Sequence, residues 1–408
     1  MNGMATHVVP PRGMRDFLPA QKRRRERVLS TIREAFAAHG FAEIETPVVE
    51  DVARLHSGLG GDNEKLTFRV MKRGITAEDL AEAADPIDLA DLGLRFDLTV
   101  PLARFHSSNR ASLPPVFRAV QIAPVWRAER PQKGRFRQFM QCDIDILGEA
   151  GIGAELELLT AAGDALGRLG LDGAFIRVND RRVLFAVLDA ASVPADKQDS
   201  ALIAIDKLDK IGADGVTAEL AEMGLDGARV MQIINELAAG SVPDGIDEDQ
   251  LATVRELLEA DCGVRIEFDP SLVRGMGYYT GAIYEIAHPD LPYSIGGGGR
   301  YDGMIGRFSG TDVPAAGISL GFERLVDLVE LEDDGIETIG LIVDKRSSAD
   351  ALIKAKRALI SEGKRVVIAK QTNNMKSVMA QIAEAGATHF AFVTPSTDAS
   401  AIEVKPLD

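Results

Sequence analysis

Two long runs of strand-forming residues flank a short basic segment, and they constrain the fold more than any other feature. The runs read VFRAVQIAPVWRAE (116–129) and RQFMQCDIDILG (137–148). Joined by this basic segment, the runs predict an antiparallel hairpin with a long, charged tip. From Arg127 to Arg137 the chain carries five cationic side chains and one acidic side chain.

This basic tip belongs to an acidic chain. The sequence holds 46 Lys and Arg against 62 Asp and Glu, which gives a net charge of −16. Proteins that coat nucleic acid need a broad basic face, so this balance argues against such a role and leaves room for a local basic site. The 408 residues exceed one compact core, so we expect two or three domains.

Cysteine use and hydrophobicity indicate a cytoplasmic protein. Cys142 and Cys262 are far apart and form no CxxC pair, which favours a reducing compartment. The six histidines show no zinc-site spacing. The N-terminus has no secretory core, and no run approaches the ~20 apolar residues that cross a bilayer, so we expect no membrane association.

The texture of the sequence changes along the chain. Residues 21–40 predict a helix, 41–50 a strand that ends near Pro47, and 92–105 a strand that becomes helical after Pro101. Residues 179–262 predict a helical insertion. Strand-forming and glycine-rich segments follow over 263–330. A linker at 330–337 leads to 338–408, where strands and helices alternate as in a small α/β domain. This last segment has more basic than acidic residues, which hints at a polyanionic partner.

The basic hairpin admits two interpretations. A solvated charged loop that protects a sheet edge is the plainer one. However, Arg127 precedes the tip within the strand-like run, and Phe139 lies on the returning run. A guanidinium and an aromatic ring on facing strands suit a nucleotide, because one neutralises phosphate and the other stacks on a base.

Three other segments carry polar or glycine-rich patterns. LVRGMGYYTG (272–281) joins Arg274 to a tyrosine pair and fits either a turn or a polar pocket wall. Four consecutive glycines, 296–299, match no phosphate-loop motif but allow a ligand to lie against the backbone. Asp143 and Asp145 share one strand face with Gln141, and acids there need partners if they are buried.

Together these segments resemble the histidyl-tRNA synthetases, a family of class II aminoacyl-tRNA synthetases. The likeness covers GMRDFLP (13–19), FAEIETPVVE (41–50, class II motif 1), the hairpin (motif 2), LVRGMGYYTG, GGGGRYDGM (296–304) and GISLGFERL (317–325, motif 3). It implies an α+β fold: a mostly antiparallel sheet flanked by helices. The implied catalytic domain spans 1–178 and 263–330, with an insertion at 179–262 and an anticodon-binding α/β domain at 338–408.

The resemblance also implies roles for individual residues. The family's catalytic arginines correspond to Arg127 and Arg274, which would meet the ATP α-phosphate and the reacting carboxylate. The residues implied in ATP binding are Arg127, Glu129, Phe139 and Arg324. Those implied in histidine binding are Asp97, Gln141, Asp145, Arg274, Tyr278, Tyr279 and Tyr301. Those implied in contacting the tRNA acceptor end are Arg130, Lys133, Arg135 and Arg137. Gly277 departs from the acid that is common in the family, and the short C-terminus would reduce anticodon contacts.

The expected activity is a ligase reaction. ATP would activate L-histidine to histidyl-adenylate, and histidine would pass to the 3′ end of tRNA-His. Mg²⁺ would assist, with unknown protein ligands and no protein metal site, and the enzyme would be a homodimer. The main alternative is the non-catalytic regulatory subunit of ATP phosphoribosyltransferase, which generally lacks the anticodon domain and the intact loop. A class II synthetase for another amino acid is a third interpretation.

Overall fold

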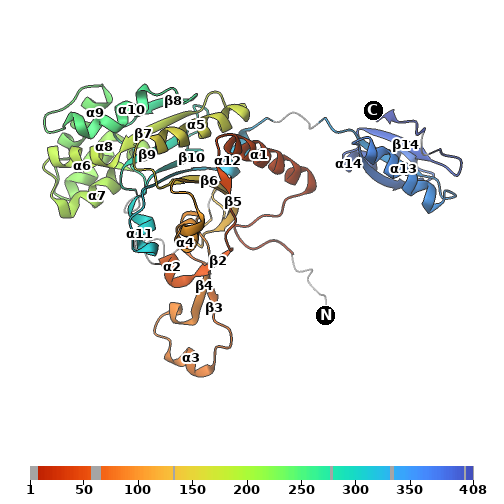
Figure 1. Ribbon diagram of the computed structural model, residues 1–408, viewed down its shortest axis with the longest axis horizontal. Helices are drawn as coiled ribbons and strands as arrows, with labels where there is room; N and C mark the ends of the chain where they lie inside the picture. Colours follow the sequence, from red (N-terminus) through yellow and green to blue (C-terminus); the bar gives the residue numbers. More distant parts are fainter. Residues whose placement is uncertain are drawn as a thin grey trace. The chain divides into compact units, whose positions relative to one another are not determined.

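The computed structural model describes residues 8–56, 66–131, 134–275, 279–330, 335–398 and 401–407. The chain divides into two compact units, Met1–Glu330 and Leu331–Asp408, each with its own sheet (Figure 1). No helix in these described ranges is both long and apolar enough to cross a membrane.

An eight-stranded sheet forms the centre of the first unit. Its strands, in spatial order, are β1 (Ala42–Glu43), β5 (Phe117–Trp126), β6 (Gln138–Leu147), β11 (Ala315–Leu320), β10 (Gly296–Arg300), β9 (Ala282–Ala287), β7 (Phe175–Asp180) and β8 (Arg265–Phe268). All neighbours from β5 to β7 are antiparallel, and only the two edge pairs are parallel. The predicted hairpin is β5–β6, and the α+β fold with a mostly antiparallel sheet is confirmed.

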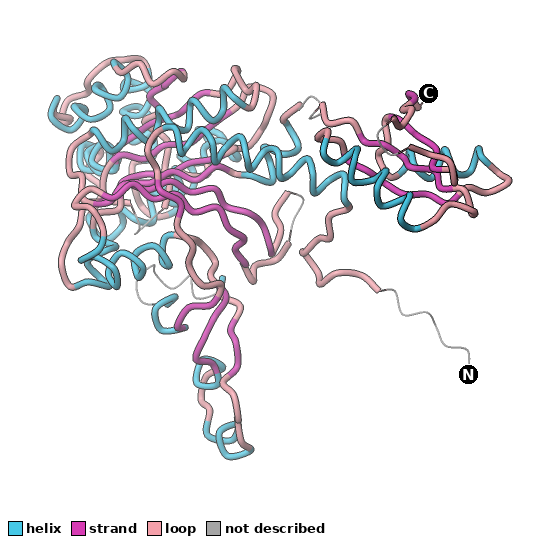
Figure 2. Tube along the Cα trace, turned by 45° about the vertical axis from the view of Figure 1, so that its right-hand side comes forward, coloured by secondary structure: helices cyan, strands magenta, loops and turns pink. Residues whose placement is uncertain are grey.

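The two faces of this sheet differ in chemistry. One face carries buried apolar side chains such as Val120, Ile144 and Ile318. They are covered by the helices α1 (Pro19–Ala38) and α5 (Gly153–Arg168) (Figure 2), and the apolar residues of both helices recur at helical spacing. On the opposite face, strand register aligns one polar row across six strands: Gln121, Asp143, Ser319, Gly297, Glu285 and Arg177. The side chains of this polar face are therefore the candidates for a binding site.

An apolar cluster closes one end of the polar face. It is built by α4 (Thr99–Asn109), α11 (Gly303–Ser309), strand residues beneath them, and Tyr301, which directly follows β10. Helix α4 begins at Thr99 rather than after the expected Pro101. The carboxylate of Asp97 accepts a bond from the Val100 amide at 3.1 Å, and Pro101 sits in the first turn, where no amide hydrogen is needed.

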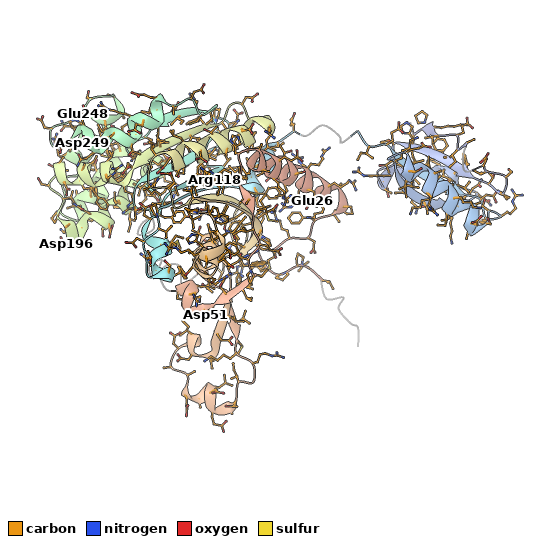
Figure 3. The ribbon with its side chains drawn as sticks, in the orientation of Figure 1. Glu26, Asp51, Arg118, Asp196, Glu248 and Asp249 are labelled. Carbon is orange, nitrogen blue, oxygen red and sulfur yellow. The ribbon has the colours of Figure 1, made fainter. Side chains whose placement is uncertain are left out.

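The predicted helical insertion lies between β7 and β8. It consists of α6 (Arg181–Ala190), α7 (Ala195–Ile205), α8 (Leu208–Glu222), α9 (Gly227–Ala238) and α10 (Glu248–Glu259). Apolar side chains join these helices, while the exposed acids Asp196, Glu248 and Asp249 lie on the outer surface (Figure 3). Acidic side chains in the first turn stabilise a helix because they interact favourably with the positive end of its dipole.

A small three-stranded sheet projects from the same unit (Figure 1). It contains β2 (Val49–Asp51), β4 (Ala90–Leu94) and β3 (Arg69–Met71), with the short helices α2 (Val52–His56), α3 (Ala77–Glu82) and a 3-10 turn at Pro86–Leu89. A further 3-10 turn, Arg110–Ser112, follows α4, and α12 (Phe322–Leu328) follows β11. The strand expected to end near Pro47 is short (β1), and a second strand, β2, begins after Pro47, which cannot donate to a ladder.

The second unit alternates strands and helices as expected. Its elements are β12 (Thr338–Val343), α13 (Ala349–Ser361), β13 (Arg365–Lys370), α14 (Met375–Glu384), β14 (His389–Val393) and β15 (Lys405–Pro406). The sheet order is β13-β12-β14-β15, parallel except for β15. Helices α13 and α14 pack on separate apolar clusters. The short strand β15 was not predicted.

Candidate active site

The hairpin places Arg127 beside Phe139. Antiparallel register sets Val125 opposite Phe139, so Arg127, directly after the end of β5, reaches across to the returning strand. Its guanidinium carbon lies 4.9 Å from the Phe139 ring centroid, and its Nε donates to the Phe96 carbonyl at 3.1 Å. The pairing expected from the sequence is thus present.

The loop at the hairpin tip has an anchored limb and an exposed limb. Arg137 donates from its backbone to Gly13 at 2.8 Å and from Nε to the Glu129 carbonyl at 3.0 Å. By contrast, Arg130 and Arg135 are exposed. Lys133 lies outside the described residues. Arg137 therefore shapes the base of the loop, although the sequence grouped it with the cations of the tip.

Three acids gather on the polar face below the hairpin. The Gln141 Nε2 donates to Asp143 at 3.0 Å, and the Ser319 hydroxyl donates to the same carboxylate. Burial raises the pKa of Asp143 to about 7, and the neighbouring Asp97 carboxylate adds to the rise.

The two flanking acids are held differently. Burial raises the pKa of Asp97 to about 6, although the Val100 amide and Arg127 oppose the rise. Burial, followed by the charge of Asp143, raises the pKa of Asp145 well above its usual range. The Tyr301 hydroxyl donates to Asp145 Oδ1 at 2.5 Å. So much buried acidity in a small volume suits a cationic or proton-donating ligand.

The glycine strand β10 makes room for two side chains of the neighbouring loop. A β-carbon on Gly297 would lie 2.6 Å from the Arg274 guanidinium carbon, and one on Gly299 would lie 2.7 Å from the Tyr279 ring. The sequence interpretation placed a ligand against this backbone. Instead, Arg274 and Tyr279 occupy the space, so β10 seats two residues that were themselves predicted in the site.

Arg274 and Tyr279 are tied into the polar face. Arg274 pairs with Glu285 of β9. Burial raises the pKa of Tyr279 to about 12, with Arg274 opposing the rise and the three acids adding to it. Tyr278 and Gly277 lie outside the described residues, so the effect of Gly277 on this loop stays a prediction.

Other cationic side chains lie near Arg324, which is in the first turn of α12. Arg324 donates to the Ser294 carbonyl and lies over the Tyr293 ring, 4.6 Å from its centroid. Burial lowers its pKa, and the like charges of Arg135 and Arg274 lower it further. Cations that repel each other at a half-buried site favour a polyanion.

Arg127 and Arg274 therefore act on one cluster from distant parts of the chain. The charge of Arg127 opposes the rise in the pKa of both Asp97 and Asp143. The charge of Arg274 opposes the rise in the pKa of Tyr279, which the same two acids increase. Both guanidiniums thus lie within electrostatic range of one group of acidic and phenolic side chains.

Comparison with known proteins agrees with the motifs. A sequence profile described as histidyl-tRNA synthetase matches residues 13–325. The histidine--tRNA ligase of Leifsonia xyli subsp. xyli is 55% identical, and the alignment covers 99% of each chain. This chain belongs to the histidyl-tRNA synthetase family.

Solved structures agree with this family assignment. The histidyl-tRNA synthetase from Nostoc sp. PCC 7120 has a TM-score of 0.73 at 25% identity, covering 94% of this chain and 90% of that one. An ATP phosphoribosyltransferase regulatory subunit/histidyl-tRNA synthetase from Bacillus halodurans has a TM-score of 0.76 at 21% identity, covering 92% and 96%. The second likeness bears on the fold alone.

Several residues of this family member were missed from the sequence. Asp143 was noted for its strand face but left out of the predicted site, and Ser319 and Glu285 were not singled out. Glu323, next to Arg324, accepts from Arg25 at 2.6 Å and from the Met140 amide at 3.1 Å. An acid within an apolar strand, as in AIYEIA (282–287), is the signal that could have found Glu285.

Proposed function

We propose that the chain activates L-histidine with ATP and then transfers histidine to the 3′ end of tRNA-His. The observation that carries the proposal is the convergence of Arg127 and Arg274 on the cluster of Asp97, Asp143 and Tyr279. Acids and a tyrosine suit the ammonium and imidazole of histidine, and the flanking guanidiniums suit a carboxylate meeting a phosphate.

In the first step a histidine carboxylate oxygen attacks the α-phosphorus of ATP. A new acyl oxygen–phosphorus bond forms, the bond to the bridging oxygen breaks, and pyrophosphate leaves. The carboxylate is already ionised at neutral pH, so this step needs charge neutralisation and alignment rather than a base. Arg127 and Arg274 are the catalytic residues we assign to that task.

ATP would lie along the hairpin. We assign the adenine to the Phe139 ring and Glu129, and the distal phosphates to Arg324. The proximity of Arg135, Arg274 and Arg324 supports this assignment. Mg²⁺ usually binds substrate phosphates with one or two carboxylates, and we propose that it enters with ATP. Within the described ranges, no group of three or more histidine, cysteine or acidic side chains could hold a metal.

Histidine would lie on the polar face. We assign its contacts to Asp97, Gln141, Asp145, Arg274, Tyr278, Tyr279 and Tyr301, and we add Asp143 because it lies among them. A site that hydrogen-bonds a polar side chain rejects analogues lacking those groups far better than an apolar pocket does.

In the second step the terminal ribose hydroxyl of tRNA attacks the activated carbonyl, and AMP leaves. We assign the acceptor end to the loop cations Arg130, Lys133, Arg135 and Arg137, with Arg137 shaping the loop base. Residues 338–408 would bind the anticodon, and 179–262 would be an insertion between the catalytic segments 1–178 and 263–330. A homodimer in the cytoplasm, where tRNA is charged, completes the proposal.

The regulatory-subunit alternative is not favoured. The Leifsonia relative that covers the whole chain is named a histidine--tRNA ligase, and the basic loop and the C-terminal α/β unit are both present. Histidine-dependent ATP–pyrophosphate exchange tests the proposal with purified protein. Exchange with histidine alone among the amino acids is expected. If no amino acid promotes exchange above background, the protein does not catalyse activation.

A further inference from the structure

The guanidinium of Arg274 is held by two neighbouring strands, β10 and β9. The Gly297 backbone of β10 lies beneath its guanidinium, leaving no space for a β-carbon. Glu285 of β9 accepts from its Nη1 through Oε2. The side chain of Arg274 is about a quarter exposed, so it is accessible to a ligand.

The second oxygen of Glu285 is also engaged. Arg177 of β7, directly opposite Glu285 in the sheet, donates from Nη1 to Glu285 Oε1 at 3.2 Å. Glu285 therefore bridges two arginines. A carboxylate bound at both oxygens has little freedom to rotate, so it holds the Arg274 guanidinium in one orientation.

Arg177 is itself fixed from two further sides. Its Nε donates to Asp269 Oδ2 at 2.6 Å, and Nη1 donates to Asp209 of α8 at 3.1 Å. A planar guanidinium can serve several carboxylates at once, which an ammonium group cannot do in the same geometry. Arg177 thus links the sheet, the loop before Arg274 and the helical insertion.

Strand β7 also holds the backbone of that loop. The Asp269 amide donates to the Val178 carbonyl at 2.9 Å, and Asn179 Nδ2 donates to the Leu272 carbonyl at 3.1 Å. The other Asp269 oxygen accepts from the Ser271 amide at 2.9 Å. Consecutive residues of β7 therefore fix the chain that leads into Arg274.

We propose that Arg177 and Glu285 are positioning residues that orient Arg274 for adenylate formation, with Asp209 extending this network into the helical insertion. The inference rests on the proposed function because it takes Arg274 as the group that meets the reacting carboxylate and phosphate. Neither positioning residue would touch substrate. Each acts by fixing where a positive charge stands as the α-phosphorus becomes crowded.

Glu285→Gln and Arg177→Met test the network, because both keep side-chain volume and remove the charge. Both should lower the rate constant of adenylate formation, by up to about 100-fold, since small displacements of a catalytic group cost that much. The KM values for ATP and histidine should change much less. Arg177→Lys should recover only part of the rate.

Arg118→Met is the matched control. Arg118 lies on β5, where it pairs with Glu157 of α5 at 2.6 Å on the opposite face of the sheet (Figure 3). This variant loses a comparable ion pair and should keep the wild-type rate. An equal loss of rate in Arg118→Met would mean that any broken ion pair in this sheet disturbs catalysis, and the inference would fail.

A double-mutant cycle separates positioning from general stability. In an Arg274→Ala background, Arg177→Met should lower the rate little further, because its effect passes through Arg274. Additive losses would overturn the inference while leaving the proposed function intact.

Amide hydrogen exchange gives a readout that does not depend on catalytic turnover. Residues 269–275 should exchange faster in Arg177→Met than in Arg118→Met, and unchanged protection would also overturn the inference. If the wild-type protein showed no histidine-dependent ATP–pyrophosphate exchange, the proposed function would be refuted instead.

Discussion

Replacing Asp143 with asparagine should stabilise the unliganded protein while weakening histidine binding. Asp143 is 5% exposed, and its carboxylate accepts hydrogen bonds from the neutral groups of Gln141 and Ser319. Burial raises its pKa to about 7. Against an ordinary value near 4, that rise means that ionising Asp143 costs the folded state about 4 kcal/mol.

The sign of the pH dependence follows from proton uptake. Between about pH 4 and 7 the folded state holds a proton on Asp143 that the unfolded state has lost. The contribution of Asp143 to stability is therefore fully present below about pH 4 and is lost as the pH rises to about 7. The amide of the Asp143→Asn variant does not titrate, so it has no such dependence. The stability advantage of the variant should grow from near zero at about pH 4 to about 4 kcal/mol above about pH 7.

Urea unfolding of both proteins across about pH 4 to 8 measures this difference directly. Calorimetric titration with histidine near the upper end of that range should show weaker binding by the variant, because the negative charge of Asp143 is gone while an oxygen acceptor for Gln141 remains. Parallel stability curves would refute the argument that Asp143 is buried at an electrostatic cost. Unchanged histidine affinity would remove Asp143 from the ligand site.

Three further variants test other parts of the site. Gly297→Ala places a methyl group against both the Arg274 guanidinium and the Tyr284 carbonyl oxygen of β9, so it should slow pyrophosphate exchange by at least about 10-fold and also lower the stability in urea. Tyr301→Phe leaves buried Asp145 without its hydroxyl donor and should destabilise the protein by about 1–3 kcal/mol in urea, together with a higher KM for histidine. Arg130→Ala should raise the KM for tRNA and lower the salt slope of tRNA binding by about one, while pyrophosphate exchange is unchanged. The charge of Arg135 acts on Arg324, so Arg135→Ala should impair both tRNA charging and pyrophosphate exchange.

The hairpin and the alternating C-terminal unit could be predicted because their patterns are local. Alternating apolar residues, a short basic connection and helical periodicity suffice for such elements. The pairing of Arg127 with Phe139 followed from the same hairpin, because antiparallel strands bring residues on either side of a tip together.

The partners of Arg274 could not be predicted in this way. Glu285 and Arg177 meet it only because β9, β10 and β7 lie side by side, and β7 is separated from the other two strands by the whole helical insertion. Single-sequence patterns contain no record of such long-range neighbours. The position of Asp143 was visible from strand alternation, but its raised pKa depends on burial by the fold and on Asp97, which a different segment supplies.

The bare strand β10 has a consequence for reading variation in this protein. A comprehensive substitution screen should find Gly297 and Gly299 among the least replaceable positions, although neither contributes a functional group. A β-carbon at either position would meet Arg274 or Tyr279 and also a backbone carbonyl of β9, that of Tyr284 for Gly297 and that of Ala282 for Gly299. Inactivating changes at these glycines should therefore combine damage to the arginine or the tyrosine with strain in the sheet.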